Sequence, residues 1–294
     1  MHEVHDNMEL WDYYSDSRVL WEIFKAVRYR ELAFVFPLDV SALRYFIIMT
    51  PGFLRDRLRI LCTSEKYRRK AVNIFMSVER VRKSAGNGRV LRPKLDLGRR
   101  WRMHVWGRDV VIDVDAAVPG DAPLEERISV ARETAGKIAL FLDSLDAPYS
   151  LVFSGARGFH VWVFWEDIKE GLKSCGIEPP TSPKDIASLV IALQRFIVMR
   201  SVGLTCPHVD ACTFSTQKDL IRVPYTHNWK TGLICLPLSR EQFEDFAPCL
   251  ALPEEVLGLE RLGWRGWVRR QGDPGALVEE FLHSRLAVDL VAKA

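Results

Sequence analysis

The stretch that decides the fold is residues 109–115, which read Asp109-Val110-Val111-Ile112-Asp113-Val114-Asp115. Its run of Val and Ile predicts a buried strand. Because side chains alternate along a strand, Asp113 and Asp115 are expected on the same face. Two carboxylates this close repel each other unless cations lie between them, and hard oxygen ligands suit Mg²⁺ or Mn²⁺. The same pattern also fits two acids that simply end a strand.

A glycine-bearing bend follows along the chain, at Ser154-Gly155-Ala156-Arg157-Gly158. The apolar runs 150–153 and 159–164 on either side predict two strands of a hairpin. Glycine lets the backbone approach a ligand closely, and Ser154, Arg157 and His160 can all donate hydrogen bonds to phosphate oxygens. The alternative is an ordinary glycine turn in which His160 belongs to the core.

A third polar cluster lies between two short apolar strands predicted at 219–224 and 233–237. It contains Arg222, His227 and Lys230. Cations that emerge from a sheet need anionic partners, and a triphosphate would supply them.

The remaining pattern is mixed. A helix that starts near residue 8, with Trp21, Phe24 and Val27 on one face, is predicted to run into a strand at 32–36, and further helices are predicted at 124–145 and from Ser182 onward. The hairpin argues against an all-parallel sheet, so we expect an α+β fold whose antiparallel sheet holds the site. We expect a catalytic core over 1–250 and a helical extension packed on it over 251–294.

The charge is distributed unevenly. The chain carries a net charge of +3, yet residues 51–108 hold 17 basic and 4 acidic side chains. Such a block is typical of a polyphosphate partner, although a solvated helical face is the alternative. The residues predicted to contact DNA are Arg68, Arg69, Lys70, Arg80, Arg82 and Lys83.

Composition restricts the class of protein. No apolar run reaches the roughly 20 residues of a membrane span, and the first residues lack the apolar segment of a secretory signal. The six cysteines are scattered over 294 residues. We therefore expect a cytoplasmic protein with reduced thiols and no membrane partner.

Taken together and in this order, the clusters resemble the small catalytic subunit of the archaeal and eukaryotic DNA primases. Asp113-x-Asp115 is similar to the acidic motif of that family, and residues 154–160 are similar to its Ser-Gly-x-x-Gly-x-His motif. Residues 220–224 with Lys230-Thr231-Gly232 resemble its third motif, and residues 30–34, Arg-Glu-Leu-Ala-Phe, resemble a fourth patch. The resemblance spans about residues 10–240.

The resemblance implies template-directed nucleotidyl transfer that makes primers from nucleoside triphosphates on single-stranded DNA. It implies that Asp113, Asp115 and Asp210 are catalytic and hold two Mg²⁺ or Mn²⁺ ions. It further assigns the nucleotide to Ser154, Arg157, His160, Arg222, His227 and Lys230. Relatives of this kind work as a heterodimer with a primase large subunit, so such a partner is expected.

Three departures from that pattern stand out. No cysteine lies between Asp115 and Ser154, so the zinc knuckle usual in the family is predicted to be missing. His227 follows Pro224 by three residues instead of four, and Ala156 stands where many relatives have a second Arg. Residues 206–212 offer Cys206, His208 and Cys212 without a clear fourth ligand, so structural zinc is not expected.

Two other classes of function stay open at this point. One is a related primase–polymerase or break-repair polymerase that shares the same site. The other is a non-catalytic primase accessory or nucleic-acid-binding subunit, against which the retention of all three acids argues.

Overall fold

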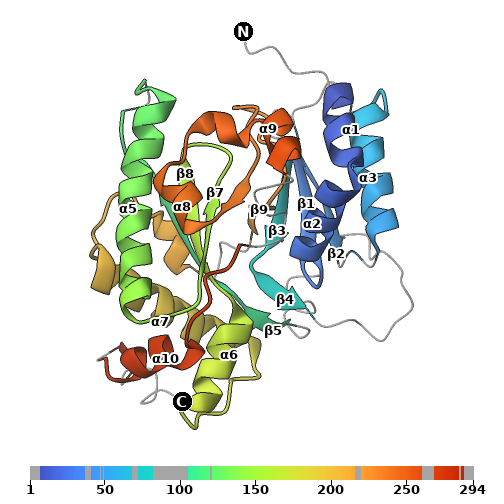
Figure 1. Ribbon diagram of the computed structural model, residues 1–294. Helices are drawn as coiled ribbons and strands as arrows, with labels where there is room; N and C mark the ends of the chain where they lie inside the picture. The colour runs from blue at the N-terminus through green and yellow to red at the C-terminus, as the bar shows by residue number, and fades with distance from the viewer. Residues whose placement is uncertain are drawn as a thin grey trace.

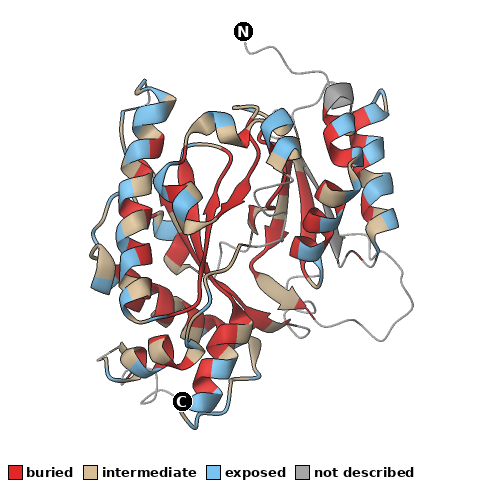
Figure 2. Ribbon diagram, viewed as in Figure 1, coloured by how far each residue is buried: buried red, intermediate tan, exposed pale blue. Residues whose placement is uncertain are grey.

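Two antiparallel sheets form the centre of the protein, and helices lie around them (Figure 1). The computed structural model describes residues 7–36, 41–46, 48, 50–67, 72–81, 105–119, 121–215, 220–259, 268–284 and 286–287. Strand residues are mostly buried, whereas the helices alternate between buried and exposed positions (Figure 2). This is the α+β architecture with antiparallel sheets that was predicted.

The first sheet has the strand order β2-β1-β3-β9. Its strands are β1 (Glu31–Phe36), β2 (Ser41–Phe46), β3 (Asn73–Ser77) and β9 (Leu220–Arg222). Three helices lie beside it, namely α1 (Asn7–Ser15), α2 (Ser17–Val27) and α3 (Pro51–Thr63) (Figure 1). The pairing of β3 with β9 brings Arg222 opposite Phe75, although the two are far apart in the chain.

The second sheet has the order β10-β7-β8-β6 and contains the decisive stretch of the sequence. Its strands are β6 (Val110–Asp115), β7 (Ser150–Phe153), β8 (Gly158–Val163) and β10 (Leu236–Leu238). The helices α5 (Leu124–Ser144) and α7 (Pro183–Ser201) pack against it and against each other. All six residues of β8 are buried, so this strand is the centre of the core.

The smaller elements complete the two layers. They are the ribbon of β4 (Glu79–Val81) and β5 (Val105–Arg108), the helices α6 (Trp165–Ser174), α8 (Arg240–Glu244), α9 (Pro253–Gly258) and α10 (Pro274–Leu282), and the 3₁₀ turns η2 (Ala211–Phe214) and η3 (Pro248–Ala251). Helix α10 packs on α6, so this part of the predicted C-terminal extension lies against the core.

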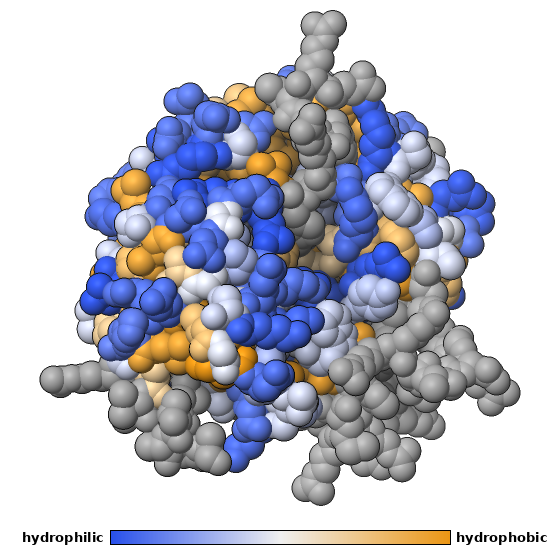
Figure 3. All heavy atoms as spheres, turned by 60° about the horizontal axis from the view of Figure 1, so that its bottom comes forward, coloured by the Kyte–Doolittle hydropathy of each residue, from blue (hydrophilic) through white to orange (hydrophobic). Residues whose placement is uncertain are grey.

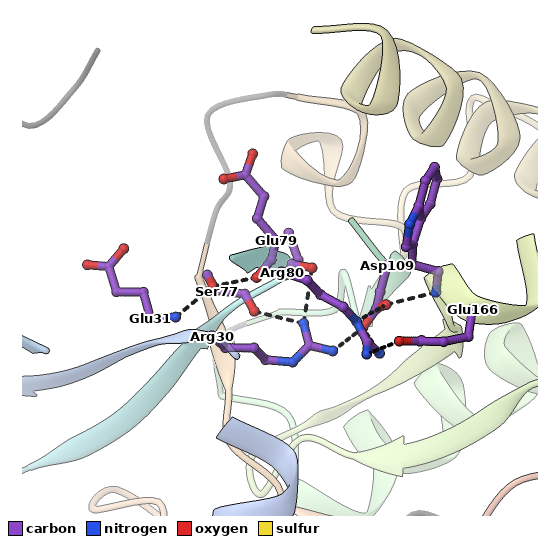
Figure 4. A network of polar contacts seen from close by, with 9 residues as sticks. Arg30, Glu31, Ser77, Glu79, Arg80, Asp109 and Glu166 are labelled. Carbon is purple, nitrogen blue, oxygen red and sulfur yellow. Dashed lines mark hydrogen bonds and ion pairs between the residues drawn. The ribbon is translucent and has the colours of Figure 1, made fainter. Parts of the chain in front are cut away.

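A buried network of ion pairs joins the two sheets (Figure 4). Arg30, just before β1, pairs with Asp109, just before β6, and also donates to the backbone carbonyls of Ser77 and Val78 at 3.0 Å. Arg80 contacts both Asp109 and Glu166. The Asp109 side chain is completely buried. Burial of an unpaired carboxylate is costly, so the positive charges of Arg30 and Arg80 stabilise it there.

The predicted N-terminal helix is divided in two. The Asp16 side chain accepts hydrogen bonds from the N–H groups of Arg18 and Val19 and starts a new helix at Ser17. Trp21 and Phe24 lie together, with ring centroids 5.5 Å apart, and Phe24 and Val27 are buried, whereas Trp21 is 50% exposed. Residues spaced by three drift around a helix of 3.6 residues per turn, so Trp21, the first of the three, lies at the edge of the buried face.

The face of the protein that carries α6 and α10 is mainly polar where the structure describes it (Figure 3). On the face that carries α6 and α10, hydrophilic residues cover most of the described surface, and apolar residues lie between them in smaller groups (Figure 3). No helix within the described ranges has the length and hydropathy of a transmembrane span.

Candidate active site

The two aspartates of β6 lie side by side on one face of the second sheet, as the alternation of strand residues requires. Strand β6 pairs with β8, so Asp113 lies opposite His160 and Asp115 lies opposite Gly158. The Asp113 side chain is 14% exposed and the Asp115 side chain is 37% exposed. Both carboxylates are therefore close to solvent at the end of a buried strand.

The third aspartate reaches the same place from a distant segment. Val209 forms an antiparallel bridge with Val114, the Asp210 N–H donates to the Asp113 carbonyl at 2.9 Å, and the Asp115 N–H donates to the His208 carbonyl at 2.9 Å. Opposed residues of an antiparallel pair point to the same side. Asp210 therefore lies next to Asp113 on the face that carries both β6 aspartates.

The outer edge of β6 is covered by side chains that the sequence did not single out. The Gln194 amide on α7 donates to the Val111 carbonyl at 2.9 Å, and the Asp113 N–H donates to Thr213 Oγ1 at 3.3 Å. An edge strand exposes unpaired backbone groups, so these contacts fix the strand that holds the acids. Gln194 carries a weak sequence signal, since it is an amide among the apolar positions of a predicted helix.

The bend at residues 154–158 needs its two glycines for different reasons. Gly155 has φ +76°, a left-handed conformation that glycine adopts without strain. A Cβ on Gly158 would lie 2.1 Å from the Val114 carbonyl oxygen, so β6 passes too close for any side chain. Ser154 Oγ accepts hydrogen bonds from the N–H groups of Ala156 and Gly158 at 3.3 Å and holds the bend closed.

The basic residues of this bend lie against the acids of β6. Arg157 Nη2 is 3.2 Å from Asp115 Oδ2, and its side chain is 49% exposed. His160 is buried, with Nε2 at 3.6 Å from Asp113 Oδ1. The two predicted nucleotide-binding residues are thus neighbours of the two predicted metal ligands.

Arg222 enters the site from the first sheet. Its Nη1 donates to Asn73 Oδ1 at 2.7 Å, and its guanidinium carbon lies 5.0 Å from the centre of the Phe75 ring. Burial lowers the pKa of Arg222, while the nearby carboxylate of Asp113 acts in the opposite direction. The charge of a β9 cation is therefore influenced by an acid of β6.

The loop between β9 and β10 brings His227 and Lys230 to the same region. The Thr231 hydroxyl donates to the Gly155 carbonyl, which ties this loop to the glycine bend. Tyr14 of α1 accepts a hydrogen bond from the His227 N–H at 3.0 Å, and Tyr13 donates to the Tyr225 carbonyl at 3.1 Å. Neither tyrosine belongs to a sequence motif, and both are far from the motifs in the chain.

The three acids have the donor type that a divalent ion prefers, and the strand pairing puts them on one face. Their side chains are nevertheless turned toward partners of their own, and Asp210 Oδ1 accepts from the Cys212 N–H at 2.8 Å. Within the described residues no three His, Cys, Asp or Glu side chains converge closely enough to hold a metal ion. His208 Nδ1 accepts from the Ala117 N–H at 3.0 Å.

Of the residues predicted to contact DNA, the structure describes Arg80. Its side chain is 14% exposed and contacts two carboxylates in the network between the sheets, so we assign it a structural role. The other predicted DNA contacts lie outside the described residues: Arg68, Arg69, Lys70, Arg82 and Lys83.

Two curated proteins are similar to this chain in sequence. They are the DNA primase small subunit PriS of Pyrobaculum aerophilum, 30% identical over 171 residues, and that of Pyrobaculum calidifontis, 30% identical over 168 residues. Each match covers 47% of this chain and 54% of the relative, so the chain spans about half the length of the curated relatives it matches. The resemblance to primase small subunits that the motifs predicted is confirmed. No protein-family model matches the chain.

A solved structure is similar in fold over most of the chain. The polymerase domain of Mycobacterium tuberculosis Ligase D, in complex with DNA, superposes with a TM-score of 0.55 at 15% identity. The match covers 89% of this chain and 90% of that domain. The chain therefore has the fold of this polymerase domain.

Proposed function

We propose that this protein is a primase-type nucleotidyltransferase, the catalytic subunit of a DNA primase that makes short primers from nucleoside triphosphates on a single-stranded DNA template. The observation that carries the proposal is the pairing of residues 208–210 with β6. This pairing puts Asp210 beside Asp113, on the face that also carries Asp115. Arg157 of the glycine bend contacts Asp115, and Arg222 of the first sheet lies near Asp113.

The reaction would join a 3′-hydroxyl oxygen to the α-phosphorus of an incoming triphosphate and release pyrophosphate. Arg157, Arg222 and Lys230 would bind the phosphate oxygens of the substrate through charge-assisted hydrogen bonds. Ser154 and the glycines of the bend would allow the backbone to approach the triphosphate closely. His160 and His227 would orient the nucleotide from the second sheet and from the loop.

Asp113, Asp115 and Asp210 would hold Mg²⁺ or Mn²⁺, whose oxygen preference matches carboxylates. When bound, two such ions supply positive charge that stabilises the attacking and leaving oxygens. The acids would have to turn from their present partners toward the ions, and Arg157 would exchange Asp115 for phosphate.

Two macromolecular partners belong to the proposal. The names of the two curated relatives and the basic composition of residues 51–108 support a single-stranded DNA template. A large primase subunit is proposed as the second partner, since both relatives are named as small subunits.

A related polymerase activity is a second candidate. It is favoured by the similarity to a polymerase domain of a DNA ligase, which covers nine-tenths of both chains. Such an enzyme would extend an existing primer, whereas a primase also joins the first two nucleotides.

The test is incorporation of labelled nucleotides on single-stranded DNA with Mg²⁺ or Mn²⁺, with and without a primer. We expect products in both reactions, and products only with a primer would favour the second candidate.

Asp113→Asn and Asp210→Asn should each lower the rate by about a hundredfold or more, because each removes a charge that the transition state requires. Asp245→Asn, the same change at an exposed position, should leave the rate unchanged. Full activity of Asp210→Asn would contradict the proposal.

A further inference from the structure

The two fully buried arginines within the described residues, Arg30 and Arg108, each form an ion pair with an acid. In the part of the chain that the structure describes, Arg30 and Arg80 contact Asp109, and Arg108 contacts Glu79 at 3.3 Å. This is the expected pattern, because a cation removed from water needs a compensating charge. Arg222 differs in its direct contacts, which are a neutral amide and an aromatic ring, and the Asp113 carboxylate acts on it without forming an ion pair.

The neutral partner of Arg222 is Asn73, a buried residue of β3. Its Oδ1 accepts from Arg222 Nη1 at 2.7 Å and also from the Trp229 N–H at 3.4 Å. One oxygen therefore fixes a cation of β9 and the loop that carries Lys230. The ammonium of Lys230 lies 5.7 Å from the centre of the Trp229 ring, so this contact places both predicted phosphate ligands.

The chemistry of an amide explains why this position does not hold an acid. A carboxylate would accept the same two hydrogen bonds, but it would also neutralise the guanidinium. An amide oxygen positions the guanidinium and leaves its full charge to attract an anion from outside. In the sequence, Asn73 shows only as a polar residue that interrupts the apolar run from Ala71 to Met76.

We propose that Asn73 is a positioning residue that fixes Arg222 and the Trp229–Lys230 segment for the phosphate groups of a nucleoside triphosphate without forming an ion pair with Arg222 itself. This inference rests on the proposed nucleotidyl transfer. It predicts that affinity for phosphate depends on the neutrality of residue 73 as well as on its shape.

The variant that separates charge from shape is Asn73→Asp, which keeps the acceptor and adds a negative charge. Binding of ATP and of AMP in the presence of Mg²⁺ is measured by calorimetry on the full chain. We expect the dissociation constant for ATP to rise about tenfold or more, and that for AMP to rise less. The melting temperature should stay the same or rise, because the new carboxylate pairs with Arg222. Asn73→Ser, which is too short to reach both donors, should weaken ATP binding and lower the melting temperature.

A matched control is Gln242→Glu on α8. It makes the same change from amide to carboxylate at a side chain that also accepts a backbone N–H, from Ser239 at 2.9 Å. Its ATP affinity should equal that of the wild type.

Two outcomes are distinguishable. If wild-type protein binds no ATP, the proposed function fails and the inference with it. If wild type binds ATP and Asn73→Asp binds it equally well, or if Asn73→Asp melts at a lower temperature, the role of Asn73 alone is overturned.

Discussion

Gly158 shows how a single residue sets the geometry of the candidate site. It lies opposite Asp115 in the pairing of β6 with β8, and the two backbones approach too closely there for a side chain. The close approach keeps Arg157, the preceding residue, next to the Asp115 carboxylate. The glycine is therefore required by packing between strands, whereas Gly155 is required by its left-handed backbone.

Gly158→Ala is expected to be destabilising and to impair the site. The new Cβ would lie 2.1 Å from the Val114 carbonyl oxygen and 2.4 Å from Asp115 Oδ1, so β6 must shift. Overpacking of this kind costs about 1–3 kcal/mol of unfolding free energy. Urea denaturation measures that loss, and the incorporation assay should fall with it.

The control for this change is Gly52→Ala in α3. A Cβ there meets no heavy atom within 4 Å, and alanine is the better helix former. Its unfolding free energy should equal or slightly exceed that of the wild type. An equal effect of the two substitutions would show that β6 and β8 are not in close contact at Gly158.

At this scale the sequence predicts the residues that carry charge or conformational freedom, and it misses those that support them. Asp113 and Asp115 follow from strand alternation, and Gly155 follows from its position in a bend. Asn73, Gln194 and Tyr14 act on residues more than 80 positions away in the chain. Such contacts depend on which strands pair, and no local pattern encodes that choice.

Among the elements, α1 supports the loop between β9 and β10. The hydroxyl of Tyr14 accepts the His227 N–H and that of Tyr13 donates to the Tyr225 carbonyl. Tyr225 itself has φ +63°, which is strained for a residue with a side chain. The helix therefore holds a strained loop whose residues are proposed to contact the nucleotide.

Tyr14→Phe should loosen that loop. It leaves the buried His227 N–H without its acceptor, at a cost of about 1–3 kcal/mol in unfolding free energy. We also expect a higher KM for nucleotide with a smaller change in kcat, because the loop is proposed to bind substrate and not to supply the proposed catalytic carboxylates. Tyr149→Phe is the matched control, since its hydroxyl donates to Asp143 Oδ1 at 2.9 Å in another part of the molecule. An unchanged KM in Tyr14→Phe would contradict a role for α1 in the site.

Elements with a regular spacing of apolar residues were predicted well, whereas the strands of the basic segment 51–108 were not predicted. Helix α5 and the hairpin of β7 and β8 appear where apolar spacing put them, and Ser182 caps α7 as predicted. Residues 51–108 contain α3, which suits the helical alternative for this segment, but β3, β4 and β5 follow within it. Their strand identity comes from pairing with β1 and with each other, which charge patterning does not reveal.

For the whole molecule, the relation of the two sheets determines whether Arg222 meets Asp113. The first sheet supplies the cation and the second supplies the acid, and the network around Asp109, just before β6, connects the sheets (Figure 4). Burial raises the pKa of Asp109, but Arg30 and Arg80 outweigh it and the net shift is downward. The carboxylate thus stays charged in the folded protein.

Asp109→Asn tests this connection through stability and its dependence on pH. Because Asp109 has a lower pKa folded than unfolded, its stabilisation is fully present above the unfolded value of about 4 and is lost as pH falls through the folded pKa. The substitution leaves Arg30 buried without its counter-charge, so we expect a loss of about 3–5 kcal/mol at pH 7. Urea denaturation of both proteins at pH 7 and at pH values below 4 should show the difference shrinking with acid, as wild-type Asp109 becomes protonated. A difference that is small at pH 7, or equal at every pH, would mean that packing alone joins the sheets.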